Sequence, residues 1–268
     1  MVLRLIPALL AAVVLAAAAV LVSASADAGS AGRDRLPDLD QEPPSMLVVT
    51  RVGPPEQPEF RLGFRSAVRN VGDGPLIIDG RRDGLDSDTM VADQLVARDS
   101  GPRTQVQGIG RFRYVVSPDH RHWHLLRFQR YELRRAGSKE AVVTDRKTGF
   151  CLGDRYSAGG RLLRNRAPRP MFTSRCGLEQ TELLGIREGI SVGYGDDYSA
   201  NLEGQYLSLT GLADGRYVLV HRVNAGRRIR ETGYHNNAAS VLISLHWRLG
   251  MPYVRVLERC PDSARCGS

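Results

Sequence analysis

Short runs of β-branched and apolar residues, separated by Gly, Pro, Asp and Asn, recur along the chain from residue 46 onward. No long stretch beyond the N-terminal region has the periodicity of an amphipathic helix. The pattern predicts about ten strands joined by frequent turns. We therefore expect an all-β protein, an antiparallel β-sandwich with long loops and little helix. The expected strands are 46–52, 61–71, 74–80, 112–116, 189–195, 204–212, 215–223, 239–247 and 252–258.

Three segments are less regular. Residues 90–98 fit either a strand or a short helix, and residues 154–187 carry Gly, Pro and Arg clusters that predict loops. Asp214-Gly215 lies between two expected strands and predicts a hairpin turn.

The N-terminal region has the pattern of an export signal. Arg4 precedes an apolar run over residues 5–22, and Ala-x-Ala sequences end at Ala26 and Ala28. This pattern predicts a signal peptide over residues 1–28, with an uncleaved membrane anchor as the alternative. We expect a flexible linker over 29–45, a single domain over 46–268, and a secreted protein that meets a membrane only if the leader is retained.

The chain is basic, with a formal net charge of +8 and a pI near 9.7. Nucleic acid is not an expected partner, because the arginines are scattered and no nucleic-acid motif is present. Acidic polymers, cell surfaces and anionic protein substrates suit a basic exported protein better. Solubility alone explains the charge equally well.

The four cysteines agree with export. Of three possible pairings, we favour Cys151–Cys176 and Cys260–Cys266, because each closes a modest loop in an oxidising compartment. Zinc ligation by cysteine is the alternative, and no C-x-x-C spacing supports it.

The strongest chemical signal is His120, His122 and His124, at alternate positions in residues 117–133. In a strand, alternate side chains share one face, whereas in a helix they do not. The outer two would lie about 13 Å apart on a flat strand, so one metal requires a bend or converging rings. Three imidazoles favour Cu(II) or Zn(II). The alternative is a surface strand with Trp123 packed beneath it.

The apolar pattern changes phase within the same segment. Leu126 and Phe128 continue the histidine face, whereas Tyr131 and Leu133 lie on the other face. A β-bulge near Gln129 or Arg130 would reconcile them and bend the strand.

Several segments, in one order, resemble the lysyl oxidase family. The histidine segment with Phe128 and Tyr131-Glu132-Leu133 is similar to the copper strand of that family. The resemblance continues through Leu36-Pro37-Asp38-Leu39, Phe64, Val68, Asn70, Gly72, Lys147-Thr148-Gly149-Phe150-Cys151-Leu152, Gly189-Ile190, Gly193, Asp196, Tyr198, Gln205, Leu209-Thr210, Gly215-Arg216-Tyr217, Glu231 and Tyr234-His235-Asn236-Asn237.

The resemblance implies a copper(II)- and quinone-dependent amine oxidase. It places copper on His120, His122 and His124, and a lysine tyrosylquinone crosslink between Lys147 and Tyr198. The implied reaction oxidatively deaminates primary amines, peptidyl lysine among them, to aldehydes, consuming O₂ and releasing hydrogen peroxide and ammonia.

A general base is also required, and the sequence does not assign it. Asp196 and Asp197, near Tyr198, are candidates, but both also suit a turn.

The chain departs from the family pattern in some places. Arg130 stands where the family has a further histidine, and the cysteines are fewer. His221, His235 and His246 do not fall on ligand positions; we expect His235 in a turn and His246 in a strand. A non-catalytic exported β-sandwich that binds copper or zinc, and a surface-binding module with incidental histidines, are therefore the alternatives.

Overall fold

The computed structural model describes residues 32–267, except residues 119, 146, 148 and 160–161. The expected signal peptide or anchor, residues 1–28, and the first residues of the expected linker lie outside the described residues. Across the part that is described, no helix has the length and apolar character needed to cross a membrane.

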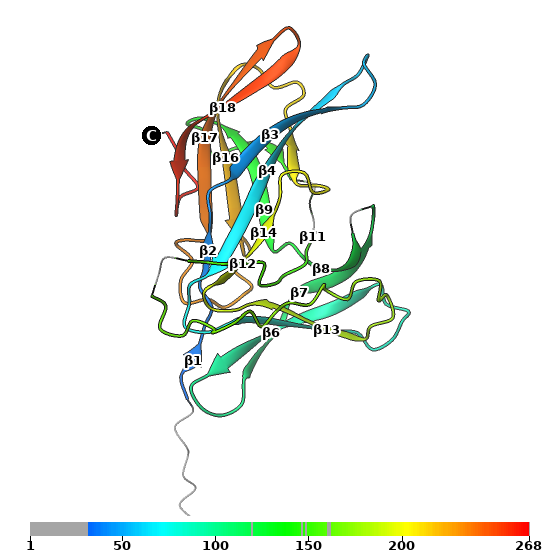
Figure 1. The fold of residues 1–268 in the computed structure, drawn as a ribbon, viewed down its shortest axis with the longest axis vertical. Coiled ribbons are helices and arrows are strands. Elements are labelled where there is room, and N and C mark those ends of the chain that lie inside the picture. Colours follow the sequence, from blue (N-terminus) through cyan, green and yellow to red (C-terminus); the bar gives the residue numbers. More distant parts are fainter. Residues whose placement is uncertain (1–31, 119, 146, 148, 160–161, 268) are drawn as a thin grey trace, which may run out of the picture. The chain divides into compact units, whose positions relative to one another are not determined.

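The described residues form eighteen strands in three sheets and no helix (Figure 1). The strand pairs are antiparallel, so the predicted all-β antiparallel fold class is confirmed. More strands are present than predicted, because strands of two residues, such as β11 (Gly149–Phe150) and β12 (Tyr156–Ser157), are too short to show a periodic pattern.

The seven-stranded sheet carries the histidine segment. Its order is β11-β8-β7-β6-β5-β13, and β1 pairs with β6. Residues 90–98, which fitted a strand or a helix, lie in a strand of this sheet. The remaining bounds are β1 (Asp34–Arg35), β5 (Leu76–Arg81), β6 (Thr89–Arg98), β7 (Thr104–Val116), β8 (Arg121–Leu126) and β13 (Gly185–Ile190).

The other two sheets have five and six strands. The five-stranded sheet contains β10 (Ala141–Thr144), β9 (Gln129–Arg135), β16 (Gly215–Val223), β17 (Ala238–Arg248) and β18 (Met251–Cys260), in that order. The six-stranded sheet surrounds β4 (Glu59–Asn70) and also contains β2 (Leu39–Gln41), β3 (Ser45–Val52), β12, β14 (Tyr194–Tyr198) and β15 (Tyr206–Ser208).

The hairpin predicted at Asp214-Gly215 is wrong. β15 pairs with β4, whereas β16 pairs with β9 and β17, so the two flanking strands belong to different sheets. The Asp214 carboxylate instead accepts a hydrogen bond from the Trp247 amide at 2.9 Å.

The linker prediction also fails for part of its length. β1 and β2 both lie within residues 29–45, and all three residues of β2 are buried. The Leu39 amide donates to the buried Glu231 carboxylate at 2.7 Å, and Asp40 forms an ion pair with Arg69 at 2.7 Å. The segment is held by polar contacts and contains no apolar run, and for this reason its sequence pattern suggested a linker.

One continuous core joins strands from the three sheets. Phe150, at the end of β11, packs edge-to-face against Tyr131 of β9 and Tyr198 of β14, with ring centroids 6.1 and 5.2 Å apart. Phe64 of β4 contacts Tyr131 at 5.1 Å in the same manner. Such aromatic pairs favour defined geometries. β11 is therefore held at the junction of the sheets.

The loop-rich region is tied to this junction. The disulfides are Cys151–Cys176 and Cys260–Cys266, the pairing favoured from the sequence. Cys151 directly follows β11, and the Cys176 carbonyl accepts a hydrogen bond from the Trp123 amide at 2.8 Å. The long loop is thus attached to both β11 and β8.

Candidate functional site

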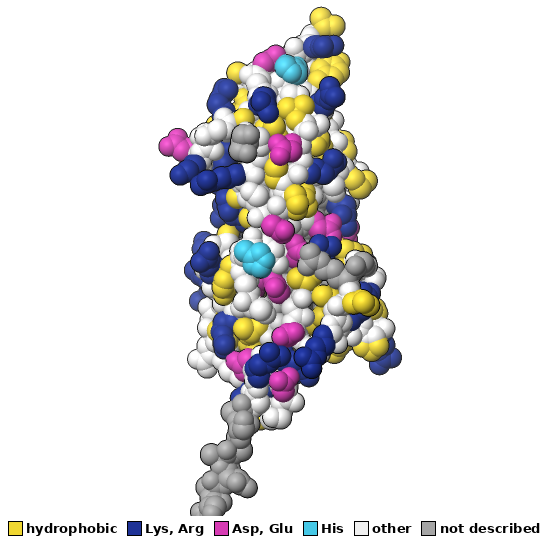
Figure 2. All heavy atoms as spheres, turned by 90° about the vertical axis from the view of Figure 1, so that its left-hand side faces the viewer, with side chains coloured by type: hydrophobic (Ala, Val, Ile, Leu, Met, Phe, Trp, Pro, Cys, Tyr) yellow, Lys and Arg dark blue, Asp and Glu magenta, His cyan; other side chains and the backbone are white. Residues whose placement is uncertain are grey.

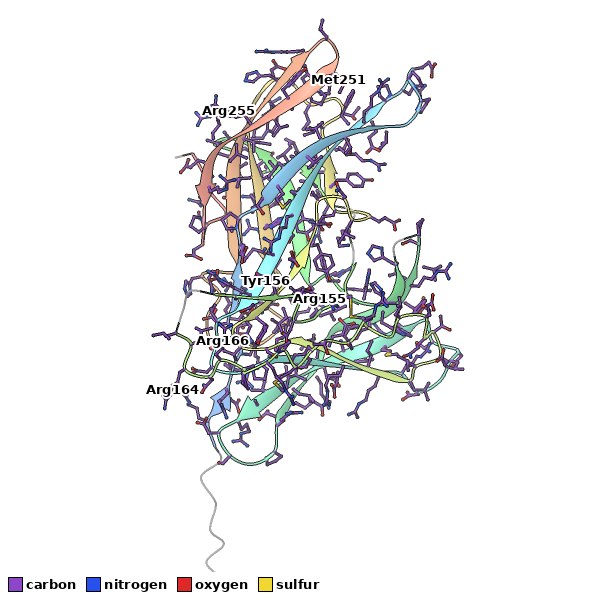
Figure 3. The ribbon with its side chains drawn as sticks, viewed as in Figure 1. Arg155, Tyr156, Arg164, Arg166, Met251 and Arg255 are labelled. Atoms are coloured by element: carbon purple, nitrogen blue, oxygen red, sulfur yellow. A yellow bond between two sulfur atoms is a disulfide. The ribbon has the colours of Figure 1, made fainter. Side chains whose placement is uncertain are left out.

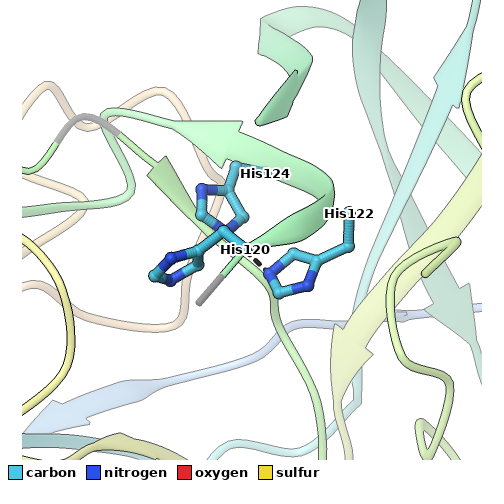
Figure 4. Close-up of side chains that lie close together, drawn as sticks. All are labelled: His120, His122 and His124. Carbon is cyan, nitrogen blue, oxygen red and sulfur yellow. Dashed lines mark hydrogen bonds between the residues drawn. The ribbon is translucent and has the colours of Figure 1, made fainter. Parts of the chain in front are cut away.

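The three histidines converge. His122 and His124 lie in β8, and His120 directly precedes it (Figure 4). One ring nitrogen from each lies within 4.8 Å of the others, and the Nε2 atoms of His122 and His124 are 2.8 Å apart. Three imidazoles in this arrangement fit one Cu(II) or Zn(II) ion.

A turn produces this convergence. Ser117 and His120 exchange backbone hydrogen bonds of 2.7 and 3.3 Å in the connection between β7 and β8. His120 therefore lies off the flat strand, and the span expected for an extended trio is shortened.

The predicted bulge is wrong. β8 ends at Leu126, Arg127 adopts a left-handed conformation with φ of 60°, and β9 begins at Gln129 in a different sheet. The change of sheet explains the phase shift, because each half of the segment has its own buried face.

Burial keeps the strand histidines neutral. It lowers the pKa of His122 to about 4 and that of His124 to about 2, and neighbouring positive groups add to both shifts. A neutral imidazole has the free lone pair that a metal ligand needs. The environment therefore suits metal binding.

Lys147 and Tyr198 lie side by side. The Lys147 Nζ atom is 5.0 Å from the centroid of the Tyr198 ring, and both side chains are buried. Burial lowers the pKa of Lys147 to about 8, and the Glu203 carboxylate opposes this shift. The Tyr198 hydroxyl donates to the Cys151 carbonyl at 2.8 Å. The two residues that the family resemblance paired therefore lie together in the structure.

Glu203 and Gly149 connect this pair to the histidines. Glu203 approaches His120 Nδ1 with its carboxylate at 3.5 Å and accepts from Lys147 Nζ at its carbonyl at 3.4 Å. Gly149 follows Lys147 by two residues, and a Cβ there would lie 2.5 Å from the Cβ of His124. The two groups therefore belong to one site. The sequence offered no signal for Glu203, which lies in a loop.

The sequence model of the lysyl oxidase family matches residues 108–251, more than half of the chain. The chain belongs to the lysyl oxidase family. The matched region includes the three histidines, Lys147 and Tyr198.

Curated members of the lysyl oxidase family are similar over part of their length. Protein-lysine 6-oxidase of Gallus gallus is 28% identical over 119 residues, which is 44% of this chain and 24% of that protein. Lysyl oxidase homolog 1 of Homo sapiens is 28% identical over 129 residues, 48% of this chain and 19% of that protein. The match thus spans about a quarter or less of these relatives.

Two carboxylates lie beside the tyrosine of this lysyl oxidase family member. Asp196 is 1% exposed, and neither of its oxygens has a hydrogen-bond partner among the described residues, but its Oδ1 atom forms an ion pair with Arg155 Nε at 3.7 Å. Burial raises its pKa well above the usual range. Asp197 instead bonds to Arg65 at 2.8 Å. Because side chains alternate along β14, Asp196 and Tyr198 share a face.

Glu188 is a further buried acid that the sequence analysis missed. Its Oε2 atom accepts from the Leu152 amide at 2.8 Å, and burial raises its pKa well above the usual range. The available signal in the sequence was a charged residue directly before the expected strand over 189–195.

The remaining histidines lie outside the group. His221 is fully buried between Phe64 and Tyr131, where burial lowers its pKa to about 3. His235 lies in a turn and His246 in β17, as expected.

Two other features are not additional ligands. Arg130 forms an ion pair with Asp145 at 3.2 Å. A second cluster, Glu258 with Cys260 and Cys266, is occupied by the disulfide between its cysteines.

Proposed function

We propose that this protein is a secreted copper- and quinone-dependent amine oxidase. It would convert primary amines, including peptidyl lysine, to aldehydes, with O₂ as the acceptor and with release of hydrogen peroxide and ammonia. The observation that carries the proposal is the 5.0 Å approach of Lys147 Nζ to the Tyr198 ring, beside three converging histidines. Family membership supports it.

We assign the metal to His120, His122 and His124. Their nitrogens form a donor set suited to Cu(II), and their burial keeps the imidazoles neutral.

We assign the organic cofactor, lysine tyrosylquinone, to Lys147 and Tyr198. When formed, it supplies an electrophilic carbonyl for the substrate amine and accepts two electrons. A lysine with a pKa of about 8 carries a substantial neutral fraction near neutral pH, and only the neutral amine is nucleophilic. Burial and the hydrogen bond to Cys151 hold the Tyr198 ring in one position.

We assign Asp196 as the general base. It shares a face of β14 with Tyr198, and its carboxylate, 3.7 Å from Arg155 Nε, has no hydrogen-bond partner among the described residues. Its raised pKa makes the ionised carboxylate a stronger proton acceptor than an exposed aspartate. Asp197 forms a hydrogen-bonded ion pair with Arg65 at 2.8 Å, a closer contact than the one between Asp196 and Arg155, and suits the role less well.

The proposed location is extracellular. Two disulfides indicate an oxidising compartment, and the pattern of residues 1–28 indicates export. We propose that the catalytic domain covers residues 46–268 and is extended by β1 and β2.

Mass spectrometry of the copper-loaded, aerated protein tests the function. A crosslinked peptide joining the Lys147 and Tyr198 segments, together with amine-dependent peroxide release, is the expected result. Copper-loaded protein with neither would support the second candidate, a non-catalytic copper- or zinc-binding relative. The replacement of a family histidine by Arg130 favours that candidate.

A further inference from the structure

Two adjoining cavities lie beside the candidate site. The larger, about 560 Å³, is lined by parts of β6, β7 and β8 and by residues 224–229. The smaller, about 350 Å³, is lined by Lys147. Leu126, Arg127 and Arg130 line both cavities. We call the two together the arginine groove.

The larger cavity is strongly basic. Arg111, Arg127, Arg130 and Arg228 line it, and no acidic residue is among its described lining residues. The Arg127 and Arg228 guanidinium groups form no ion pair or hydrogen bond within the described chain, and Arg111 bonds only to the Thr89 hydroxyl at 3.3 Å. On the face shown in Figure 2, by contrast, basic and acidic side chains are interspersed. Arg130 pairs with Asp145, which lines the smaller cavity, so the unpaired positive charge of the groove comes from Arg111, Arg127 and Arg228.

The cavity floor is apolar and open. Ile109, Leu125, Phe128 and Ile229 are buried beneath it. An added Cβ at Gly108 would meet nothing within 4 Å. A space of this size accepts extended side chains with apolar stems and charged ends.

Arg127 occupies a fixed place between the cavities. Its left-handed backbone forms the turn by which the chain passes from the seven-stranded to the five-stranded sheet. The backbone conformation of a residue at such a turn is fixed by the strands on both sides. The backbone of Arg127 is therefore fixed, and its exposed side chain lines both cavities, within reach of a ligand that extends from the larger cavity toward Lys147.

We propose that the arginine groove binds a carboxylate-rich peptide segment, so that the preferred substrates are lysines flanked by Asp or Glu. The inference rests on the proposed amine oxidase function for the identity of the reacting lysine. Guanidinium groups bind carboxylates through paired, charge-assisted hydrogen bonds. The apolar floor contacts the methylene groups of glutamate.

The charge of the groove also acts on the incoming amine. A lysine ammonium alone is repelled by the surrounding cations, whereas flanking carboxylates attract it. The same positive field lowers the pKa of the amine and increases the neutral fraction that can act as a nucleophile.

Binding of peptides that cannot react tests the groove separately from catalysis. The probes are a short fluorescein-labelled peptide in which glutamates flank norleucine, and its glutamine counterpart. Fluorescence anisotropy with the full chain should show tighter binding of the glutamate peptide, weakened by added NaCl. Equal binding of the two peptides would overturn the proposal.

Substitutions locate the binding site. Asparagine replaces Arg127 because it tolerates a left-handed backbone. The double variant Arg127→Asn with Arg228→Asn should bind the glutamate peptide more weakly, by roughly tenfold for each guanidinium removed. Gly110→Leu should also weaken binding, because a Cβ there meets only Leu125 Cδ1, at 3.6 Å, and the side chain fills the cavity. Arg255→Asn with Arg259→Asn, both on β18 (Figure 3 labels Arg255), is the charge-matched control, and thermal denaturation checks folding.

The outcomes separate the two proposals. His122→Ala should bind the glutamate peptide as the parent does, even without amine oxidation. If Arg127→Asn with Arg228→Asn binds the peptide unchanged, or if a labelled oligonucleotide binds these arginines more tightly than the peptide, the groove proposal is wrong. A protein that binds the peptide but oxidises no amine overturns only the oxidase function.

Discussion

At the scale of single residues, the site depends on side chains made neutral by burial. His124 and Lys147 are both buried, and in each case removal from water shifts the pKa toward the uncharged form. Neutral imidazoles bind metal and a neutral amine attacks a ring, so burial prepares the residues for both proposed roles.

His122→Ala should remove the metal. One of three nitrogen ligands is lost, and two imidazoles bind Cu(II) far more weakly. Elemental analysis after dialysis should show a several-fold lower copper content. His235→Ala, in an exposed turn, is the control and should keep the parent content. An unchanged copper content in His122→Ala would show that the metal site does not lie on β8.

Tyr198→Phe should retain copper and lose turnover. The ring remains, but without its hydroxyl it cannot form the quinone, and the bond to the Cys151 carbonyl is lost at a cost of about 1 kcal/mol in unfolding free energy. Peroxide assays and thermal denaturation measure the two effects. Amine oxidation by this variant would contradict the assignment of the cofactor.

The histidine site could be predicted from sequence, but its surroundings could not. A two-residue period assigned His122 and His124 to one strand face, since strand geometry is local. Glu203 contacts His120 only because a distant loop returns to the site, and local periodicity does not report such a contact. The conformation of Arg127 was likewise unpredictable, because an arginine at positive φ is set by the two strands that it joins.

At the scale of elements, close packing of β11 on β8 brings the cofactor segment to the histidines. Gly149 pairs with Leu126, and its missing side chain admits His124. The strands with branched residues were predictable, whereas β2 and β11 were not, since their positions are set by partners from other sheets.

Gly149→Ala should therefore disturb the metal site. A Cβ placed 2.5 Å from His124 Cβ requires β11 or β8 to shift, with a loss of about 1–3 kcal/mol in unfolding free energy. The unfolding free energy measured by denaturant titration and the affinity for copper should both decrease. Gly159→Ala is the control, because an added Cβ there meets nothing within 4 Å.

Glu231 should make stability depend on pH. Its carboxylate accepts hydrogen bonds from Leu39, Asn224 and Asn237, yet burial raises its pKa from 4.5 to about 7. Between these values the unfolded chain releases a proton that the folded chain keeps. Stability should consequently fall as pH rises through 7, by about 3 kcal/mol in total. Urea titrations at pH 5 and 8 measure the fall.

A matched variant identifies the source of this pH dependence. Glu231→Gln cannot ionise and should show a flatter profile. Because its amide group faces donors from Leu39, Asn224 and Asn237, it should also be less stable than the parent at pH 5. The same slope in parent and variant would assign the effect to other groups.

At the scale of the whole molecule, two disulfides restrain the chain to different extents. Cys151–Cys176 spans 25 positions and Cys260–Cys266 spans 6. Loop-closure entropy predicts that replacing the first pair by serine costs about 3.5 kcal/mol, and the second about 2 kcal/mol. Thermal unfolding of the two double variants compares them. A larger loss from the C-terminal pair would contradict this order.

The three histidines lie within five consecutive residues, whereas Lys147 and Tyr198 meet only where separate sheets join. A hairpin of this size closes quickly and needs few distant contacts. Metal capture can thus precede assembly of the rest of the molecule, and a core mutant with misplaced sheets can still bind copper. A full complement of copper is consequently poor evidence that the catalytic pair has been assembled.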